Sequence, residues 1–319
     1  MGIGDVATRL PAIWRAVARI VRGVRRRRPA AALLVNFTEL SARLGRWLRS
    51  QGVPVVWCVA PQIWAWRPGR AGTVGRAVDR LAVILPFEEP LWRGHGVDAT
   101  FVGHPAVSPT LPCPTAGRDE RAAAVLPGSR DGEVLRLAGP LGSAAGRMIA
   151  RGSIARATVF RAPGLGARAR EEIERAARSH RLEIVDADTE RGAGASLHAF
   201  TLALCASGTA SLEAALAGAA PVVAYRLDRI AWCLARRLVT TPHVALPNVL
   251  LGRRVYPELL QDEARPDRIA GAAEALLDGP VARGEAREHA STLRQMLLAP
   301  SGAPFGANVA RLLRSVVSR

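Results

Sequence analysis

The chain has 319 residues, of which 49% are hydrophobic and 22% charged. This composition excludes a disordered or collagen-like chain, and the length is enough for two domains with substantial cores. All 44 basic residues are Arg, a replacement of Lys that is typical of GC-rich coding. The formal net charge of +17 is a separate feature, because it indicates attraction to anionic surfaces or to ligands that carry phosphate.

The sequence lacks the signatures of several other classes of protein. It has neither zinc-finger spacing nor interleaved basic and aromatic residues, so no nucleic-acid partner is expected. The four cysteines include no CxxC pair, and three lie in apolar strand or helix segments, which favours buried, free thiols in a reducing compartment. There is no P-loop, catalytic triad or metal-ligand cluster, so we expect no metal and no cofactor.

Residues 10–28 predict an amphipathic helix with a strongly basic side. Its apolar face consists of Ile13, Trp14, Val17, Ile20, Val21 and Val24, and its polar face of Arg15, Arg19, Arg22 and the run Arg25–Arg28. Two interpretations stay open: a surface helix packed on the core, or an interfacial helix that lies on anionic lipid.

From residue 31 onward, apolar strands alternate with helices. The predicted strands are 31–36, 53–60, 81–85, 99–102, 122–126, 157–160, 182–186, 201–206 and one after Pro221, and the main predicted helices are 38–50, 131–150, 166–179, one after Thr209 and the tail 266–319. Such alternation is typical of parallel α/β sheets. A Pro-rich stretch from Pro105 to Pro114 predicts a linker between two blocks.

We therefore predict an α/β protein of two doubly wound, Rossmann-like domains with the active site in the cleft between them. The domains span 1–106 and 107–290, and helices in 291–319 are expected to pack back on the first domain. The first block opens on a helix, without the strand and Gly-rich turn that usually begin such a domain. We therefore expect it to be incomplete at its N-terminus.

The segment AAAVLPGSRDGEV at 122–134 is one candidate ligand site. A strand runs into a Pro-Gly turn at Gly128, so that Ser129 and Arg130 stand at the start of a helix. Backbone N–H groups at a helix start and the guanidinium fork suit a diphosphate. An Arg that only caps a turn is the alternative.

The segment 201–225 has a similar arrangement. An apolar strand runs into Ser207-Gly208-Thr209, and the helix that follows carries a single acid, Glu213. The loop and helix start form an anion site, and a lone carboxylate on an uncharged helix suits a sugar hydroxyl. Helix capping by the hydroxyls and a solvated Glu213 are the alternatives.

Two further loops carry candidate residues. Pro247-Asn248 follows an apolar, strand-like run, which places an amide at a strand end, where ligands bind in open α/β sheets. Glu258 and Gln261 lie one turn apart and are expected to face the same cleft; a surface loop with a helix start is the alternative. The loop 59–70, with its two tryptophans, suits a hydrophobic hinge or an acyl-chain surface.

Several segments together resemble the bacterial lipid-A-disaccharide synthases. In chain order they are WAWRPGR, LPFEEPLW, FVGHP, LPGSRDGEV, ASGTASLEAALAGAAPVV, LPNVLLGR and PELLQ, with the approximate spacing of that family. The resemblance runs from about residue 1 to the C-terminus. It implies a GT-B fold and an inverting, metal-independent hexosyltransferase at the cytoplasmic face of the inner membrane. The reaction would join UDP-2,3-diacylglucosamine to 2,3-diacylglucosamine 1-phosphate, called lipid X, to give lipid A disaccharide 1-phosphate and UDP.

The resemblance also implies roles for the candidate residues. Arg130 and the helix-start amides would stabilise charge on the leaving diphosphate, Glu213 would bind the ribose hydroxyls, and Asn248 would line the sugar site. The UDP-sugar site implied by the matching motifs comprises Gly128, Ser129, Arg130, Glu133, Ser207, Gly208, Thr209, Glu213, Pro247, Asn248, Glu258 and Gln261. The partners would be the two lipid substrates and an anionic membrane surface, and a homodimer is left open.

Two departures from the family pattern bear on activity. Members carry a Gly-rich segment upstream of the point where this chain begins, and Met1-Gly2 aligns with an internal Met-Gly, so we expect a start site upstream. The family's IDSPDFN segment aligns with VNFTELS, so Asn36 stands where the family has the Asp proposed as catalytic base. An amide cannot take up the proton of the attacking hydroxyl, and Glu39 is the candidate substitute. The catalytic set is thus Asn36, Glu39, Arg130 and Asn248.

Two other functions stay open. A non-catalytic homologue would bind UDP-sugar or lipid as a regulator or partner subunit. A different UDP-sugar enzyme of the same fold, such as an epimerase or a peptidoglycan glycosyltransferase, is disfavoured by the WAWRPGR and LPN motifs.

Overall fold

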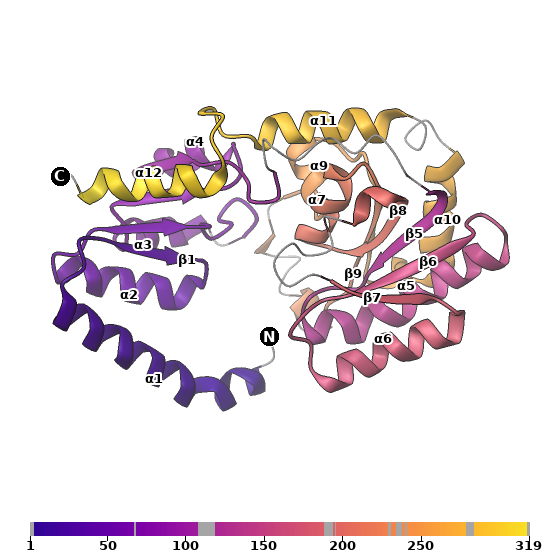
Figure 1. The fold of residues 1–319 in the computed structure, drawn as a ribbon, viewed down its shortest axis with the longest axis horizontal. Helices are drawn as coiled ribbons and strands as arrows, with labels where there is room; N and C mark the ends of the chain where they lie inside the picture. Colours follow the sequence, from indigo (N-terminus) through magenta and orange to yellow (C-terminus); the bar gives the residue numbers. More distant parts are fainter. Residues whose placement is uncertain are drawn as a thin grey trace. The chain divides into compact units, whose positions relative to one another are not determined.

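The computed structural model of the protein forms two compact units (Figure 1). Unit 1 comprises Met1–Pro109 and Leu297–Arg319, and unit 2 comprises Thr110–Met296. The structure describes residues 3–66, 68–107, 119–187, 194, 196–228, 231–233, 238–239, 241–278 and 284–317, with side chains from residue 11 onward. Most of the predicted linker, with Cys113, lies outside the described residues.

Unit 1 is built on a four-stranded parallel sheet. Its strands are β1 (Ala32–Val35), β2 (Val55–Cys58), β3 (Arg80–Val83) and β4 (Ala99–Phe101), in that order. The helices are α1 (Ile3–Arg27), α2 (Thr38–Ser50), α3 (Ala71–Gly75), α4 (Glu88–Gly94) and α12 (Phe305–Val317), with a 3₁₀ turn, η1 (Pro68–Arg70).

Alternate residues of the central strands of unit 1 pack on opposite faces of the sheet. Val55 and Trp57 of β2 belong to a core shared with α2, α3 and α4. Val56 and Cys58 of the same strand pack instead against the apolar side of α12. Because side chains alternate along a strand, a buried strand needs cover on both faces, and α12 supplies the second cover.

The first strand differs from its prediction as a buried strand over 31–36. β1 covers Ala32–Val35, and its residues alternate between partly buried and exposed, with Leu33 40% and Val35 56% exposed. β1 lies at the edge of the sheet, and α12 packs on β2 and β3. One face of β1 therefore remains accessible.

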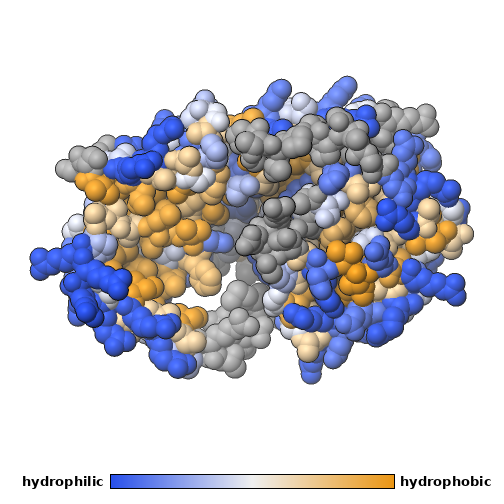
Figure 2. Space-filling view, in the orientation of Figure 1, coloured by the Kyte–Doolittle hydropathy of each residue, from blue (hydrophilic) through white to orange (hydrophobic). Residues whose placement is uncertain are grey.

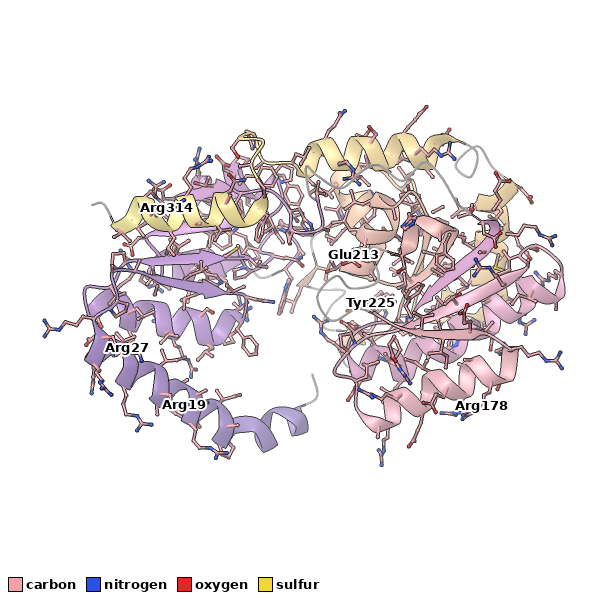
Figure 3. The ribbon with its side chains drawn as sticks, in the orientation of Figure 1. Arg19, Arg27, Arg178, Glu213, Tyr225 and Arg314 are labelled. Atoms are coloured by element: carbon pink, nitrogen blue, oxygen red, sulfur yellow. The ribbon has the colours of Figure 1, made fainter. Side chains whose placement is uncertain are left out.

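Helix α1 is amphipathic as predicted, but its apolar side is only partly covered. Val24 packs against the core of unit 1, whereas Trp14 is 69% and Ile20 40% exposed. Arg19 and Arg27 project from the helix (Figure 3), and hydrophilic surface follows α1 in the space-filling view (Figure 2). Among the described residues, no helix is long and apolar enough to cross a bilayer.

Unit 2 contains a six-stranded parallel sheet in the order β10-β9-β8-β5-β6-β7. Its strands are β5 (Asp119–Leu126), β6 (Arg156–Arg161), β7 (Glu183–Asp186), β8 (Phe200–Ala206), β9 (Ala220–Tyr225) and β10 (Glu258–Leu260). Its helices are α5 (Asp131–Ala150), α6 (Ala167–His180), α7 (Thr209–Leu216), α9 (Leu246–Leu251), α10 (Pro266–Asp278) and α11 (Ala286–Leu297), with 3₁₀ turns η2 (Leu197–Ala199) and η3 (Gln261–Glu263).

The strand order of unit 2 reverses once, between β5 and β8. Strands β5, β6 and β7 follow one another toward one edge of the sheet, and β8 then returns to the other side of β5, with Leu126 in register with Cys205. In open parallel sheets, ligands bind beyond the carboxyl ends of the strands at such a reversal. The turns that follow β5 and β8 are therefore neighbours where a ligand is expected.

Three local predictions are wrong. Asn248 lies inside α9 rather than at a strand end, because Pro247 favours the first turn of a helix. Glu258 begins strand β10, which pairs with β9, and a 3₁₀ turn starts at Gln261, so the two residues are not one helical turn apart. Cys58 and Cys205 are buried as predicted, but Cys233 is exposed.

Candidate functional site

Two glycine turns, after β5 and after β8, form the centre of the candidate site. Gly128 has a φ of +120° and Gly208 a φ of +123°, which L side chains rarely adopt. A Cβ at Gly128 would lie 2.8 Å from the Cβ of Glu133 and 3.6 Å from the Cβ of Ala206, the last residue of β8. The two turns are thus in close contact, and each leads directly into a helix, α5 or α7.

Both helices begin without a side-chain cap. Ser207 does not cap α7, because its hydroxyl donates to the carbonyl of Val244 at 2.9 Å. Ser129 and Thr209 are exposed at the two helix starts. Uncapped first-turn N–H groups carry partial positive charge, so the two adjacent helix starts favour an anion between them.

Arg130 places a guanidinium beside these helix starts. Its Nη1 donates to Oε1 of Glu133 at 2.8 Å, yet the Arg130 side chain is 71% exposed, whereas that of Glu133 is 16% exposed. Glu133 packs against Gly128 and holds Arg130 at the turn. Most of the guanidinium remains accessible to a ligand.

Glu213, on α7, is the half-buried acid of this site. Burial raises the pKa of its carboxyl, and it makes no hydrogen bond with any residue in the described parts of the chain. A partly desolvated carboxyl without an internal partner gains from a ligand hydroxyl that donates to it. This environment fits the predicted contact with ribose hydroxyls better than a solvated surface acid.

Two side chains near the carboxyl ends of the unit 2 strands were not predicted from the sequence. Tyr225 ends β9, and burial raises the pKa of its hydroxyl, an effect that Glu133 adds to and Arg130 and Arg136 oppose (Figure 3). Tyr225 is therefore within electrostatic reach of the Arg130 turn. Nε of Arg136 donates to the carbonyl of Arg226 at 3.1 Å, which ties α5 to the segment after β9. The sequence feature that could have indicated Tyr225 is its position at the end of a buried strand.

Asn248 belongs to a buried polar cluster rather than to a ligand surface. Its side chain is 0% exposed. Nδ2 donates to the carbonyl of Tyr256 at 2.9 Å and to Oε1 of Glu258 at 2.8 Å, and Oδ1 accepts the N–H groups of residues 255 and 256. The amide has no hydrogen-bonding capacity left for a sugar. The expectation that Asn248 lines the sugar site therefore gives way to a positioning role.

This cluster holds the segment to which the turn at Ser207 is hydrogen-bonded. Glu258 is 7% exposed and accepts the N–H groups of Val244 and Ala245 at 3.1 and 3.0 Å. Val244 is the residue whose carbonyl accepts the hydroxyl of Ser207. Pro247, at the start of α9, is also buried. The LPN motif thus fixes the backbone of residues 244–245, to which the turn after β8 is hydrogen-bonded through Ser207.

Gln261 has a comparable structural role. Its Oε1 accepts the N–H of Leu227 at 2.7 Å, and its Nε2 donates to the carbonyl of Leu227 at 3.2 Å. Nε of Arg226 donates to the carbonyl of Gln261 at 3.2 Å. These contacts fix the segment that follows Tyr225, so Gln261 acts on the site through the backbone.

The predicted catalytic residues Asn36 and Glu39 lie at the carboxyl edge of the unit 1 sheet. Asn36 and Phe37, after β1, have φ angles of 55° and 53°, and Val59, after β2, has 63°. Asn36 is exposed, and its Oδ1 accepts the N–H of Phe37 at 2.8 Å. Glu39 is 76% exposed and pairs with Arg70 at 2.6 Å. Positive φ at a β-branched residue is strained, and such strain clusters at functional sites.

Sequence comparisons identify the family. A profile described as lipid-A-disaccharide synthetase matches residues 1–298. The chain is 41% identical over 313 residues to the lipid-A-disaccharide synthase of Anaeromyxobacter dehalogenans strain 2CP-1, covering 96% of this chain and 80% of that protein. It is 37% identical over 333 residues to the synthase of Acidobacterium capsulatum, covering 98% and 81%. The chain belongs to the lipid-A-disaccharide synthase family. The resemblance is confirmed, and with it a hexosyltransferase function in the synthesis of the lipid A disaccharide.

Solved structures support the predicted fold of this synthase-family chain. The S. aureus MnaA–UDP structure matches with a TM-score of 0.63 at 13% identity, covering 100% of this chain and 84% of that one. The spinosyn rhamnosyltransferase SpnG with thymidine diphosphate matches with a TM-score of 0.57 at 15% identity, covering 97% and 79%. At these identities the likeness concerns the fold alone, and it confirms the GT-B class.

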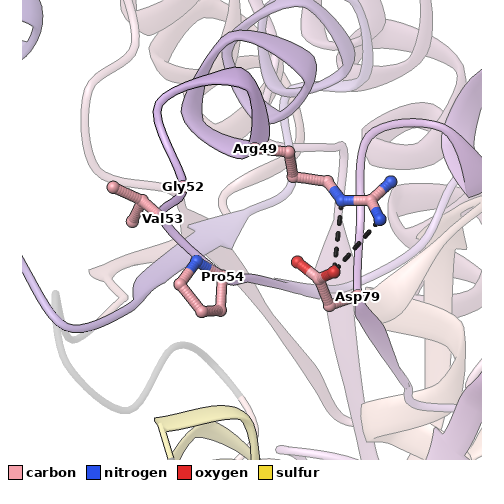
Figure 4. Close-up of a pocket in the computed structure, with 5 residues that line it drawn as sticks. All are labelled: Arg49, Gly52, Val53, Pro54 and Asp79. Carbon is pink, nitrogen blue, oxygen red and sulfur yellow. Dashed lines mark hydrogen bonds and ion pairs between the residues drawn. The ribbon is translucent and has the colours of Figure 1, made fainter. Parts of the chain in front are cut away.

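A hollow at the amino ends of the unit 1 strands is separate from the residues at their carboxyl ends. It has a volume of about 400 Å³ and is lined by Arg49, Gly52, Val53, Pro54 and Asp79, ahead of β2 and β3 (Figure 4). The Asp79 carboxylate accepts a backbone N–H at 2.8 Å and pairs with Arg49 at 3.1 Å. Its charged groups therefore satisfy one another, and it lies at the amino ends of the strands.

Proposed function

We propose that this chain transfers the diacylglucosamine of UDP-2,3-diacylglucosamine to the 6-hydroxyl of lipid X with release of UDP. The donor side is supported by one arrangement, the two adjacent glycine turns after β5 and β8. They bring together two uncapped helix starts, the accessible Arg130 and the carboxyl of Glu213, which has no hydrogen-bond partner among the described residues. These groups match the diphosphate and the ribose hydroxyls of a UDP-sugar.

The leaving diphosphate needs positive charge as the bond to the sugar breaks. Arg130 supplies it, and so do the first-turn N–H groups of α5 and α7, which the helix backbone holds in fixed positions. Because negative charge on the diphosphate grows toward the transition state, these groups bind the transition state more tightly than the substrate. Asn248, Glu258 and Gln261 hold the backbone of this arrangement in place.

The attacking hydroxyl needs a base, and Asn36 cannot be one. We propose that turnover is low and that Asn36→Asp raises it. The site accommodates the change, because Asn36 is exposed and Asp tolerates the left-handed conformation about as well as Asn. A chain that binds UDP but gains no turnover from Asn36→Asp would favour the second candidate function, a homologue that binds UDP-sugar or lipid without catalysis.

Calorimetric titration with UDP tests the donor site. Arg130→Ala and Glu213→Ala should each weaken UDP binding about 10- to 100-fold, the loss expected for a hydrogen bond to a charged group. Arg178→Ala is the matched control, because Arg178 lies in the last turn of α6 with its side chain 74% exposed. Unchanged UDP affinity in both site variants would refute the assignment.

We also propose that α1 lies on the anionic inner face of the cytoplasmic membrane. It combines exposed Trp14 and Ile20 with the basic run Arg25–Arg28. The protein should sediment with phosphatidylglycerol vesicles at low salt, less with phosphatidylcholine vesicles, and be released by high salt. Trp14→Ser should reduce the bound fraction; a fraction independent of lipid charge would exclude this electrostatic mode.

A further inference from the structure

The loop between β2 and α3 carries an aromatic–cation pair at the carboxyl edge of unit 1. Trp66 is 40% exposed, and the guanidinium carbon of Arg70 lies 4.9 Å from the centroid of a Trp66 ring. The Arg70 side chain is 23% exposed. Since this loop follows β2 and Glu39 follows β1, the pair and the carboxylate lie at the ends of adjacent strands.

The guanidinium of Arg70 retains unused hydrogen-bond donors. Nη2 donates to Oε1 of Glu39 at 2.6 Å, and none of its other nitrogens donates to a residue that the structure describes. Stacking on an aromatic ring uses the face of a guanidinium and leaves its N–H edge for an oxyanion. The ion pair with Glu39 is weak, because that carboxylate is 76% exposed, so a more highly charged ligand can displace it.

A buried carboxyl anchors the same loop to the segment after β3. Glu88 is 1% exposed; its Oε1 accepts the indole N–H of Trp64 at 3.0 Å, and its Oε2 accepts the N–H of Leu85 at 3.1 Å. The rings of Trp64 and Phe87 meet edge to face at 5.2 Å. The loop that carries Arg70 is therefore held in place before a ligand binds, which reduces the entropic cost of binding.

We propose that Arg70, stacked on Trp66, is the subsite for the phosphate of a sugar-phosphate acceptor. The proposal rests on the proposed function, which supplies an acceptor with a phosphate on its sugar. Arg–phosphate pairs form two parallel N–H···O bonds, and the unused edge of Arg70 offers this geometry. On binding, the phosphate replaces Glu39 as the partner of the guanidinium, while Trp66 keeps the guanidinium plane in position.

Ligand-observed NMR titration of the full chain tests the subsite with soluble probes. Glucosamine 1-phosphate should bind more tightly than glucosamine, and Arg70→Gln should weaken the phosphorylated probe about 10- to 100-fold without affecting glucosamine. Arg70→Lys keeps the charge but loses the forked pair of donors, so its affinity for glucosamine 1-phosphate should fall between those of the unmodified chain and Arg70→Gln. Arg311→Gln removes the same charge from α12, on the other face of the sheet, and should leave binding unchanged.

The possible outcomes separate this subsite from the donor site. Equal binding of glucosamine and glucosamine 1-phosphate, or equal losses in Arg70→Gln and Arg311→Gln, would overturn the subsite. Inorganic phosphate that binds as tightly as the sugar phosphate would overturn its assignment to an acceptor. UDP affinity, measured on the same variants, should not change. If the unmodified chain does not bind UDP, the donor site is refuted. The titrations with glucosamine 1-phosphate still test the Arg70 subsite, because they do not depend on UDP.

Discussion

The positioning role of Asn248 predicts that its loss unfolds unit 2 more easily rather than removing a sugar contact. Asn248→Ala leaves two backbone N–H groups, the carbonyl of Tyr256 and the carboxylate of Glu258 without the hydrogen bonds that the amide makes. A buried polar group that loses its partner costs about 1–3 kcal/mol. Because Glu258 keeps its hydrogen bonds to Val244 and Ala245, we expect about 4 kcal/mol in total rather than the full sum.

Thermal unfolding followed by calorimetry measures this loss. For a unit of this size, 1 kcal/mol shifts Tm by about 2–4 °C, so Asn248→Ala should lower the transition of unit 2 by about 8–16 °C. Asn248→Asp should destabilise at least as much, because it puts a second carboxylate 2.8 Å from Oε1 of Glu258. Thr209→Ala is the control, because Thr209 is exposed and makes no cap hydrogen bond.

The alternative role has a different signature. If Asn248 contacts the sugar directly, Asn248→Ala should reduce the affinity for a UDP-sugar while Tm stays within about 1 °C of the unmodified chain. That result would refute the positioning argument.

Three further predictions follow from burial and backbone geometry. Burial raises the pKa of Glu88 from 4.5 to about 7, against the hydrogen bonds that it accepts, so between these pH values the folded chain holds a proton that the unfolded chain has lost. The free energy of unfolding should therefore fall by about 3 kcal/mol as pH rises from about 4.5 to about 7. Urea titrations of Glu88→Gln should lack this dependence on pH. Gly128→Ala should destabilise unit 2 by about 1–3 kcal/mol and weaken UDP binding, whereas Gly271→Ala, inside α10 with open space around the new Cβ, should stabilise unit 2 by about 0.5–1 kcal/mol. Cys233 should react with a maleimide in the native chain, whereas Cys58, buried with its pKa raised to about 11, should react only after unfolding; peptide mapping of native labelling at Cys58 would contradict this.

Local patterns were sufficient for the architecture and for selecting the residues of the proposed donor site. The alternation of apolar strands with helices defines two parallel sheets, and helix α5 spans the predicted range, 131–150. Gly128, Arg130 and Glu213 could be selected from sequence because each lies within a few residues of a strand end or helix start.

Asn248, Glu258 and Gln261 could not be assigned in this way. Their side chains turn inward and bind groups that are distant in sequence, such as the backbone of Leu227, which lies 34 residues from Gln261. Whether an amide meets a ligand or a backbone group depends on the pairing of β10 with β9, and that pairing is non-local. Tyr225 and Arg136 were missed for the same reason.

The sequence alone determined the class of the protein, its family motifs and the candidate residues for an anion site, because strand ends and helix starts are local features. Only the tertiary structure decided which of these residues remain available to a ligand. It leaves Arg130 exposed and Glu213 partly buried, places Asn248 in a closed hydrogen-bond network, and brings Arg70 onto Trp66 beside Glu39. The physical reason is that burial and hydrogen-bond partners are set by which strands lie side by side, and the strand order reverses between β5 and β8 in a way that no local pattern encodes.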